Sequence, residues 1–343
     1  MFAAKRLALK ILSNGGVARL FQPLMVGRAS IFMLHRFDCP DVGVHGHNLP
    51  FLRAALQYLR DHRYELISLR ELHIRLSQGE KVVHKAVAFT IDDGYFDHAL
   101  VAAPIFAAYD CPVTTFVTTG FLDGQLWFWW DQIEYIFETT KCSNISISIE
   151  GTQLHYAIGT PVGAKQSQNA FTQWCKTLKA PERQGAIARL AVAAEVEVPH
   201  CPPPRYAPMS WVALRSAEKK GMDFGPHTVT HPILTQSSDD QARQEISQSW
   251  EKLCQEAQRP VPVFCYPNGR SSDFSDREIR AVRAAGMVGA VSGEPGYFDC
   301  RTLLHDQDER YKIRRFAFPN DMADLVQYVS GIERAKQVLR GEQ

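Results

Sequence analysis

An apolar run that ends in two adjacent carboxylates organises this sequence: Ala86-Val87-Ala88-Phe89-Thr90-Ile91-Asp92-Asp93-Gly94. Its first four residues show no polar alternation, which is typical of a short strand buried on both faces, as in a parallel sheet. Asp92 and Asp93 follow where that strand ends. The run therefore predicts an α/β fold whose chemistry lies at the carboxyl end of a central strand.

A second short strand, at residues 222–225, ends near two imidazoles that are four residues apart. It is followed by Pro226 and then by His227-Thr228-Val229-Thr230-His231. One carboxylate together with two histidines is a facial ligand set for a divalent metal, and it keeps open positions for water and substrate. The other carboxylate of the aspartate pair would lie beside the metal as a base. The two motifs together predict a metal-assisted hydrolase.

Strands and helices alternate through most of the chain. A predicted strand at residues 29–34 ends at His35, and another at residues 261–266 ends at Pro267-Asn268. The carboxyl ends of the strands of a parallel barrel converge on one mouth, so we expect a closed or nearly closed barrel with the site at that mouth. Further strands are predicted at residues 64–68, 112–118, 288–292 and 313–316, and helices at residues 51–63, 69–77, 98–109, 211–220, 238–258, 273–285 and 322–338.

One segment, at about residues 124–208, departs from this alternation. Its pattern predicts a hairpin at residues 145–152 and two helices at residues 168–178 and 182–194, so we interpret it as an insertion between two barrel units. It opens with Leu126-Trp127-Phe128-Trp129-Trp130-Asp131. These tryptophans could stack on sugar rings or could anchor the insertion by packing, and the sequence favours neither interpretation.

The composition is that of a soluble globular protein. The chain has 343 residues, of which 45% are hydrophobic and 22% charged, and its net charge of +1 gives no electrostatic case for a nucleic-acid partner. Its eight cysteines form no C-x-x-C pair, so we expect reduced thiols and a cytoplasmic location.

Residues 1–27 form a separate amphipathic segment ahead of the barrel at residues 28–343. Lys5, Arg6 and Lys10 alternate with leucines and isoleucines, and no apolar stretch is long enough for a signal-peptide core or a membrane span. The pattern predicts a basic amphipathic helix that either docks on the barrel or lies on a membrane surface.

Three short segments of the sequence resemble the successive motifs of one family. These segments are similar to the motifs of the polysaccharide deacetylases, the NodB-homology or carbohydrate esterase family 4 proteins. They are Thr90-Ile91-Asp92-Asp93-Gly94-Tyr95, Gly225-Pro226-His227-Thr228-Val229-Thr230-His231-Pro232 and Phe264-Cys265-Tyr266-Pro267-Asn268-Gly269. The resemblance runs from about residue 31 to residue 320 and excludes the insertion. It implies a distorted (β/α)7 barrel that removes N-acetyl groups from amino sugars with a divalent metal, which is often zinc.

The resemblance also implies roles for individual residues. Asp93, His227 and His231 would bind the metal, and Asp92 would be the general base that takes a proton from the attacking water. The backbone N–H of Asn268 would donate to the oxyanion that forms at the acetamide carbonyl.

The proton for the leaving amine has two candidate donors. Many family members use a histidine in a late Leu-x-His motif, and Leu303-Leu304-His305 matches its letters but lies in a polar stretch that we expect to be a loop. A permuted subgroup carries the histidine near its start, where Met33-Leu34-His35-Arg36 fits. We favour His35 as the general acid and keep His305 as the alternative.

The third motif departs from the family pattern at two positions. Cys265 stands where many members have an arginine that steadies the base, and Asn268 stands where many have a tyrosine. A backbone donor survives the second change, whereas the arginine would have to come from elsewhere in the chain. Candidates are Arg36, Arg270 and Arg315.

The sequence therefore predicts a metal-dependent N-deacetylase with zinc as the expected cofactor. Its expected substrate is an N-acetylated amino sugar of a surface glycan, or a lipid- or nucleotide-linked precursor in exopolysaccharide or lipopolysaccharide biosynthesis. Two alternatives remain: a deformylase or other amide hydrolase that uses the same site, and a non-catalytic carbohydrate-binding barrel. The intact aspartates and histidines argue against the second, because a binding module needs no base beside a metal.

Overall fold

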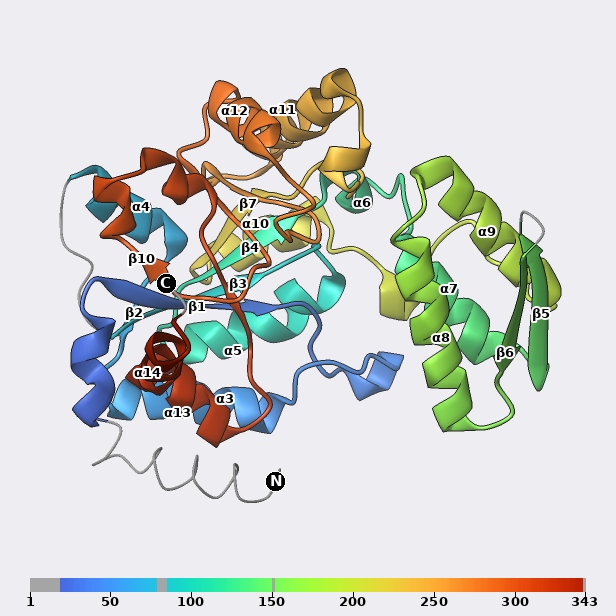
Figure 1. Cartoon of the computed structure of the whole chain (residues 1–343), viewed down its shortest axis with the longest axis horizontal. Helices are drawn as coiled ribbons and strands as arrows, with labels where there is room; N and C mark the ends of the chain where they lie inside the picture. The colour runs from blue at the N-terminus through green and yellow to red at the C-terminus, as the bar shows by residue number, and fades with distance from the viewer. Residues whose placement is uncertain (1–18, 79–84, 150–151, 342–343) are drawn as a thin grey trace. The chain divides into compact units, whose positions relative to one another are not determined.

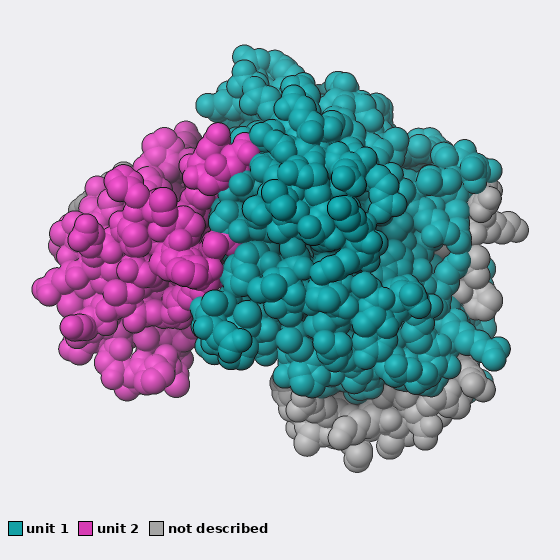
Figure 2. All heavy atoms as spheres, turned by 180° about the vertical axis from the view of Figure 1, so that it is seen from behind, with its two compact units in different colours: residues 1–122, 208–343 teal, residues 123–207 magenta. Residues whose placement is uncertain are grey.

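A computed structural model describes residues 19–78, 85–149 and 152–341. The chain divides into two compact units, which are distinguished by colour in Figure 2. Unit 1 comprises residues 1–122 and 208–343, and unit 2 comprises residues 123–207, nearly the same residues as the predicted insertion. The amphipathic helix predicted within residues 1–27 lies largely outside the described residues. Of this range the structure describes residues 19–27, which contain a 3-10 helix, η1 (Arg19–Met25). No described helix is both long and apolar enough to cross a membrane.

Unit 1 is built around seven parallel strands (Figure 1). Hydrogen bonding joins them in the order β11-β1-β3-β4-β7, with a separate parallel pair of β8 and β9. Two parallel bridges complete the ring: Phe224 with Pro260 links β7 to the segment before β8, and Val291 with Ile313 links β9 to the segment before β11. The predicted distorted (β/α)7 barrel is confirmed. Its strands are β1 (Arg28–Leu34), β3 (Ala86–Ile91), β4 (Val113–Val117), β7 (Met222–Pro226), β8 (Val263–Cys265), β9 (Gly289–Val291) and β11 (Phe316–Ala317).

The barrel strands are the predicted apolar runs. Every residue of β3 and of β4 is buried, as a strand packed on both faces requires. The register pairs Leu34 with Ile91, and Asp92 N–H extends the ladder by donating to Leu34 O at 3.0 Å. The residues that follow β1, β3, β7 and β8 therefore emerge at the same end of the barrel.

Helices of unit 1 surround these strands (Figure 1). Several begin at a side-chain cap that the sequence makes visible, such as Ser68, whose Oγ accepts from Glu71 N–H at 3.0 Å. The helices are α3 (Leu49–Asp61), α4 (Leu69–Ser77), a π-helical turn η3 (His98–Ala102) that leads into α5 (Ala103–Ala108), α6 (Thr119–Leu122), α10 (Trp211–Glu218), α11 (Asp239–Glu256), α12 (Asp276–Ala284), α13 (Met322–Ser330) and α14 (Ile332–Leu339). Short 3-10 turns are η2 (Pro40–Val42), η5 (Leu234–Gln236), η6 (Thr302–Leu304) and η7 (Gln307–Tyr311), and two short strands, β2 (Glu65–Leu66) and β10 (Phe298–Asp299), flank the barrel.

The last part of the chain differs from the prediction. The single helix expected at residues 322–338 is broken at Gly331, whose φ is +93°, and a Cβ there would lie 2.5 Å from the Phe21 carbonyl oxygen. The region that includes Asp299, expected to be a loop, contains β10, which pairs antiparallel with the start of β1. Both regions contact residues 19–29, which are distant in the sequence.

Unit 2 has a core of its own. It consists of α7 (Trp129–Thr139), a hairpin of β5 (Asn144–Ile149) and β6 (Thr152–Ala157), α8 (Pro161–Cys175), α9 (Ala180–Ala193) and η4 (Pro204–Tyr206). Trp127 is buried with its ring centroid 5.5 Å from that of Tyr135 and 5.8 Å from that of Tyr206. Trp129 packs against the hydrophobic core of the unit. These contacts favour the interpretation of Trp127 and Trp129 as packing anchors.

Candidate active site

Asp93, His227 and His231 lie together at the carboxyl ends of β3 and β7. The Asp93 Oδ1 atom is 3.8 Å from His227 Nε2 and 3.6 Å from His231 Nε2. Each of the three residues offers a ligand atom within 4.8 Å of the other two, and all three are buried. The two imidazole rings stand nearly perpendicular, with centroids 4.7 Å apart. The three predicted metal ligands thus converge on one point.

The protonation of the two imidazoles suits a metal site. His227 Nδ1 is hydrogen-bonded to the Cys265 carbonyl oxygen at 2.7 Å, which assigns the proton to Nδ1 and leaves the Nε2 lone pair directed at Asp93. Burial lowers the pKa of His227 to about 4, although the Asp92 carboxylate opposes this shift. Burial and the neighbouring His227 lower the pKa of His231 well below its usual value. Two neutral imidazoles and one carboxylate fit a divalent cation such as zinc.

A second group of potential ligands, formed by Asp92, His227 and Cys265, satisfies the same distance limit. Its oxygen and sulfur atoms are already engaged, because Arg315 Nη2 donates to Asp92 Oδ2 at 2.8 Å and to Cys265 Sγ at 3.2 Å. A cation at this group would lie beside a guanidinium. The Asp93 group is therefore the better metal site.

Arg315 supplies the arginine that the third motif lacks. Its guanidinium binds Asp92 through two hydrogen bonds, Nη1 to Oδ1 at 2.7 Å and Nη2 to Oδ2 at 2.8 Å, and its Nε donates to Ser292 O at 2.8 Å. Of the other two candidates, Arg36 pairs with Asp97 at 3.0 Å, whereas the exposed Arg270 lies in the turn after β8. The sequence left three candidates open, and the geometry selects the one that is 223 residues from Asp92.

The ion pair sets the charge of Asp92. Burial alone raises the pKa of Asp92, but the charge and the hydrogen bonds of Arg315 outweigh burial and hold the pKa well below its usual range. The carboxylate therefore stays ionised at neutral pH next to Asp93, the proposed metal ligand. An ionised carboxylate that does not bind the metal is what a general base requires.

His35 reaches the same site from the end of β1. Its side chain is in part open to solvent. The protein atoms around the ring lower the pKa of His35, and the Asp92 carboxylate opposes this shift, which places the ring near Asp92. Its backbone carbonyl oxygen is hydrogen-bonded to Nε2 of the buried His98. The structure thus brings His35 to the mouth of the barrel with its side chain open to a ligand.

His305 lies elsewhere. It follows η6, and the chain enters η6 from β10, which pairs with Arg28 and Ala29 at the amino end of β1. Because β1 is seven residues long, its two ends are about 20 Å apart. The structure therefore separates His305 from the residues at the mouth.

Asn268 occupies the turn after β8, where it is exposed. Its φ is +56°, and the turn is closed by Gly269 N–H, which donates to Pro267 O at 2.6 Å. We find no acceptor for the Asn268 N–H among the described residues. This amide is therefore available as a donor to a ligand.

Backbone strain is concentrated at these residues. Eight non-glycine residues in the described ranges have positive φ, and four of them belong to the site: Asp93 (+88°), Thr228 (+66°), His231 (+58°) and Asn268 (+56°). Such conformations cost about 1–3 kcal/mol each and persist where the surroundings enforce them. Their concentration at one place supports the assignment of the site, and no sequence pattern announces them.

The sequence did not reveal the residues that hold the histidine loop, by which we mean residues 227–231. Glu245, on α11, accepts hydrogen bonds at 2.8 Å from the backbone N–H groups of Val229 and Thr230, and at 2.6 Å from the Thr230 hydroxyl. Thr228 Oγ1 accepts from His231 N–H at 2.9 Å. In the sequence Glu245 is one of many polar residues on an amphipathic helix, so nothing distinguishes it.

Comparison with protein families gives a partial match. Residues 167–290 match the model of the family described as polysaccharide deacetylase, a range that includes both histidines and the turn at Asn268. The protein YxkH of Bacillus subtilis (strain 168), assigned by name to the polysaccharide deacetylases, is 33% identical over 64 residues, which are 19% of this chain and 23% of that protein. The aligned segment thus spans about a quarter of that relative.

Solved structures match over most of the chain. The deacetylase PplD of Streptococcus pyogenes, solved in complex with acetate, superposes with a TM-score of 0.55 at 18% identity, over 90% of this chain and 97% of that one. IcaB of Ammonifex degensii superposes with a TM-score of 0.52 at 13% identity, over 89% of this chain and 97% of that one. At these identities the likeness shows the fold. Sequence match and fold together confirm that this chain resembles the polysaccharide deacetylases and has their distorted barrel.

Proposed function

We propose that the chain is a metal-dependent N-deacetylase that hydrolyses the acetamide of an amino sugar. The observation that carries this proposal is the division of the aspartate pair: Asp93 faces two neutral imidazoles, whereas Asp92 is held ionised by Arg315. A binding module would gain nothing from a buried base beside a metal site. This arrangement argues against the non-catalytic barrel.

Each residue at the mouth has a distinct part in the proposed reaction. Asp92 takes a proton from the attacking water, and Arg315 keeps the carboxylate ionised and oriented. The Asn268 N–H donates to the developing oxyanion, and His35 gives a proton to the leaving amine. Asp93, His227 and His231 would hold a divalent cation, expected to be zinc, which when bound supplies Lewis-acid polarisation of water and of the acyl carbonyl.

We propose an N-acetylated amino sugar of a surface glycan, or its lipid- or nucleotide-linked precursor, as the substrate. The family match and the deacetylase fold support acetyl as the group that is removed. The expected cytoplasmic location favours a precursor over a finished polymer. Roles in exopolysaccharide or lipopolysaccharide biosynthesis and a peripheral membrane contact through residues 1–27 belong to the same proposal.

The test measures acetate release by protein loaded with zinc or cobalt from a panel of N-acetylhexosamine conjugates, with formate release from N-formyl analogues measured in parallel. Asp92→Asn is the control, because it keeps the shape of the side chain and removes the base. We expect acetate release that is lost in Asp92→Asn while the metal content is unchanged. Formate release alone would assign the deformylase alternative, and release of neither acid by metal-loaded protein would overturn the hydrolase proposal.

A further inference from the structure

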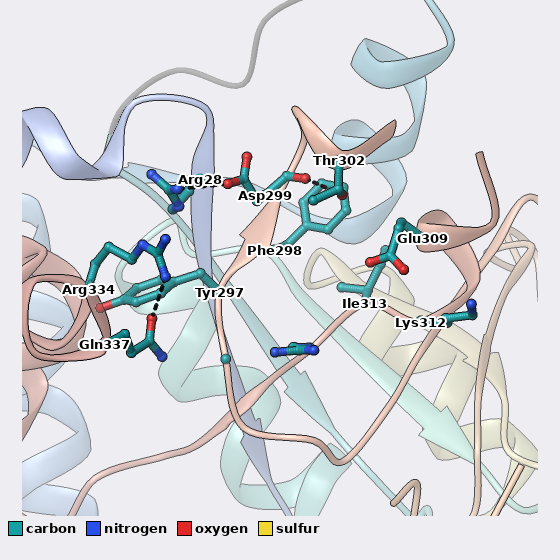
Figure 3. A pocket seen from close by; sticks show the side chains of 12 residues that line it. Arg28, Tyr297, Phe298, Asp299, Thr302, Glu309, Lys312, Ile313, Arg334 and Gln337 are labelled. Atoms are coloured by element: carbon teal, nitrogen blue, oxygen red, sulfur yellow. Dashed lines mark hydrogen bonds and ion pairs between the residues drawn. The ribbon is translucent and has the colours of Figure 1, made fainter. Parts of the chain in front are cut away.

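A cavity lies in unit 1 beside the amino end of β1 (Figure 3). Its volume is about 300 Å³. Arg28 is the first residue of β1 and His35 follows the last, so about 20 Å of strand separates these two residues. The cavity also reaches Arg314, whose neighbour in the sequence, Arg315, binds Asp92. The residues that line the cavity include none of the proposed catalytic residues or metal ligands.

The charged side chains that line the cavity are mostly cationic. The cations are Arg28, Lys312, Arg314 and Arg334, and the anions are Asp299 and Glu309. The lining thus has a surplus of two positive charges, whereas the net charge of the chain is +1. Figure 3 shows Arg28 and Arg334, from β1 and α14, on the same side of Tyr297. A concave surface lined by one sign of charge concentrates its field on a ligand of the opposite sign.

The acidic residues do not neutralise this charge. Asp299 is shared, since it pairs with Arg28 at 2.9 Å and also with Arg301 at 2.6 Å. Lys312 and Arg314 form no ion pair within the part of the chain that the structure describes. At least two cationic groups at the cavity thus lack an acidic partner in the fold.

Arg314 is directed to the cavity by its backbone. The preceding segment bridges to β9 and the following one forms β11, so Arg314 and Arg315 project to opposite sides of an extended chain. Arg315 is buried against Asp92, whereas Arg314 is exposed and lines the cavity. Gly296 permits this, because a Cβ at that position would lie 2.7 Å from the Cδ atom of Arg314.

We propose that this cavity binds a phosphate group. Guanidinium groups present paired N–H donors that match phosphate oxygens, and those of Arg314 and Arg334 line the cavity together with Lys312. The third, that of Arg28, already binds Leu24 O and Asp299 through its terminal nitrogens. The volume exceeds that of phosphate alone and leaves room for a small attached group. A soluble phosphorylated metabolite and a phospholipid head group share this chemistry. The proposal is independent of the deacetylase activity.

The test has two arms that distinguish the two sources. Titration calorimetry measures binding of inorganic pyrophosphate to the full chain, and co-sedimentation measures its retention on phosphatidylcholine vesicles with and without phosphatidylglycerol. Arg314→Gln and Arg334→Gln remove cavity cations, and Arg280→Gln is the matched control, because Arg280 is exposed on α12 outside the cavity. Thermal unfolding verifies that each variant is folded. If Arg334→Gln does not fold, the comparison rests on Arg314→Gln alone.

We expect pyrophosphate to bind and each cavity variant to weaken binding about ten-fold or more, with Arg280→Gln unchanged. Vesicle retention that requires phosphatidylglycerol and is lost in the cavity variants would assign the lipid source, whereas pyrophosphate binding without retention would assign a soluble one. Absence of binding in both arms, or equal weakening by Arg280→Gln, would overturn the proposal. Acetate release by Arg334→Gln distinguishes failure of the phosphate proposal from failure of the deacetylase proposal. We expect this variant to retain acetate release.

Discussion

The buried pair of Arg315 and Asp92 links catalysis to stability at the level of single residues. Asp92 has a lowered pKa in the folded protein, so its ionised form stabilises the fold above the pKa of an unfolded aspartate, about 3.9, and this stabilisation is lost as the pH falls towards the pKa of folded Asp92. Removing one partner of a buried pair typically costs about 3–5 kcal/mol because a charge is left without compensation.

Arg315→Gln is therefore expected to lower the free energy of unfolding of the metal-free protein by about that amount, measured by denaturant titration at neutral pH. The pKa of Asp92 should rise, so the acid limb of the kcat profile should move to higher pH. Arg270→Gln is the matched control and should change neither quantity. The double variant Asp92→Asn/Arg315→Gln should regain part of the stability without activity, and a double variant as unstable as the sum of the single ones would contradict a direct pair.

His35 and His305 give a second comparison at the residue level. Loss of a general acid costs about 10²- to 10⁴-fold in rate, so His35→Ala should lower kcat by that factor while the metal content stays unchanged. His305→Ala should be indistinguishable from the parent protein, because η6 follows β10 at the opposite end of β1. Steady-state kinetics with metal analysis decides the matter, and full activity in His35→Ala would transfer the acid role to water.

At the level of elements, the histidine loop depends on α11. Glu245 binds two backbone N–H groups and one hydroxyl of the loop at residues 227–231, whose ends carry the proposed metal ligands His227 and His231. Two residues of that loop have positive φ. We expect Glu245→Gln to weaken metal binding about 10- to 100-fold, since supporting residues of metal sites typically contribute that much. Competition with a chelator measures the affinity. Glu251→Gln, an exposed position on the same helix, is the control, and equal affinities in the two variants would show that the loop holds its shape without Glu245.

At the level of the whole molecule, the sequence predicted the parts of the fold that depend on local patterns. Apolar runs such as Ala86–Ile91 predicted the strands. A closed or nearly closed barrel was predicted from the alternation of strands and helices, but the contacts that close it, such as the single bridge of Val291 with Ile313, could not be located from local patterns. The same limit applies to the prediction of the site. Asp92 and the two histidines belong to recognisable sequence motifs, whereas Arg315 and Glu245 can be identified only by the contacts that they make in the folded chain.

The arrangement in two units predicts where a bound metal changes the dynamics of the chain. All three proposed ligands lie in unit 1, whereas unit 2 has a separate hydrophobic core. A ligand that binds only the folded state stabilises it by about 2.7 kcal/mol when its concentration is 100 times Kd. Hydrogen exchange with and without zinc should therefore show added protection at residues 91–95 and 224–231 and little change in α8 and α9 of unit 2. His231→Ala should abolish the difference, and protection that persists in this variant would place the metal at other residues.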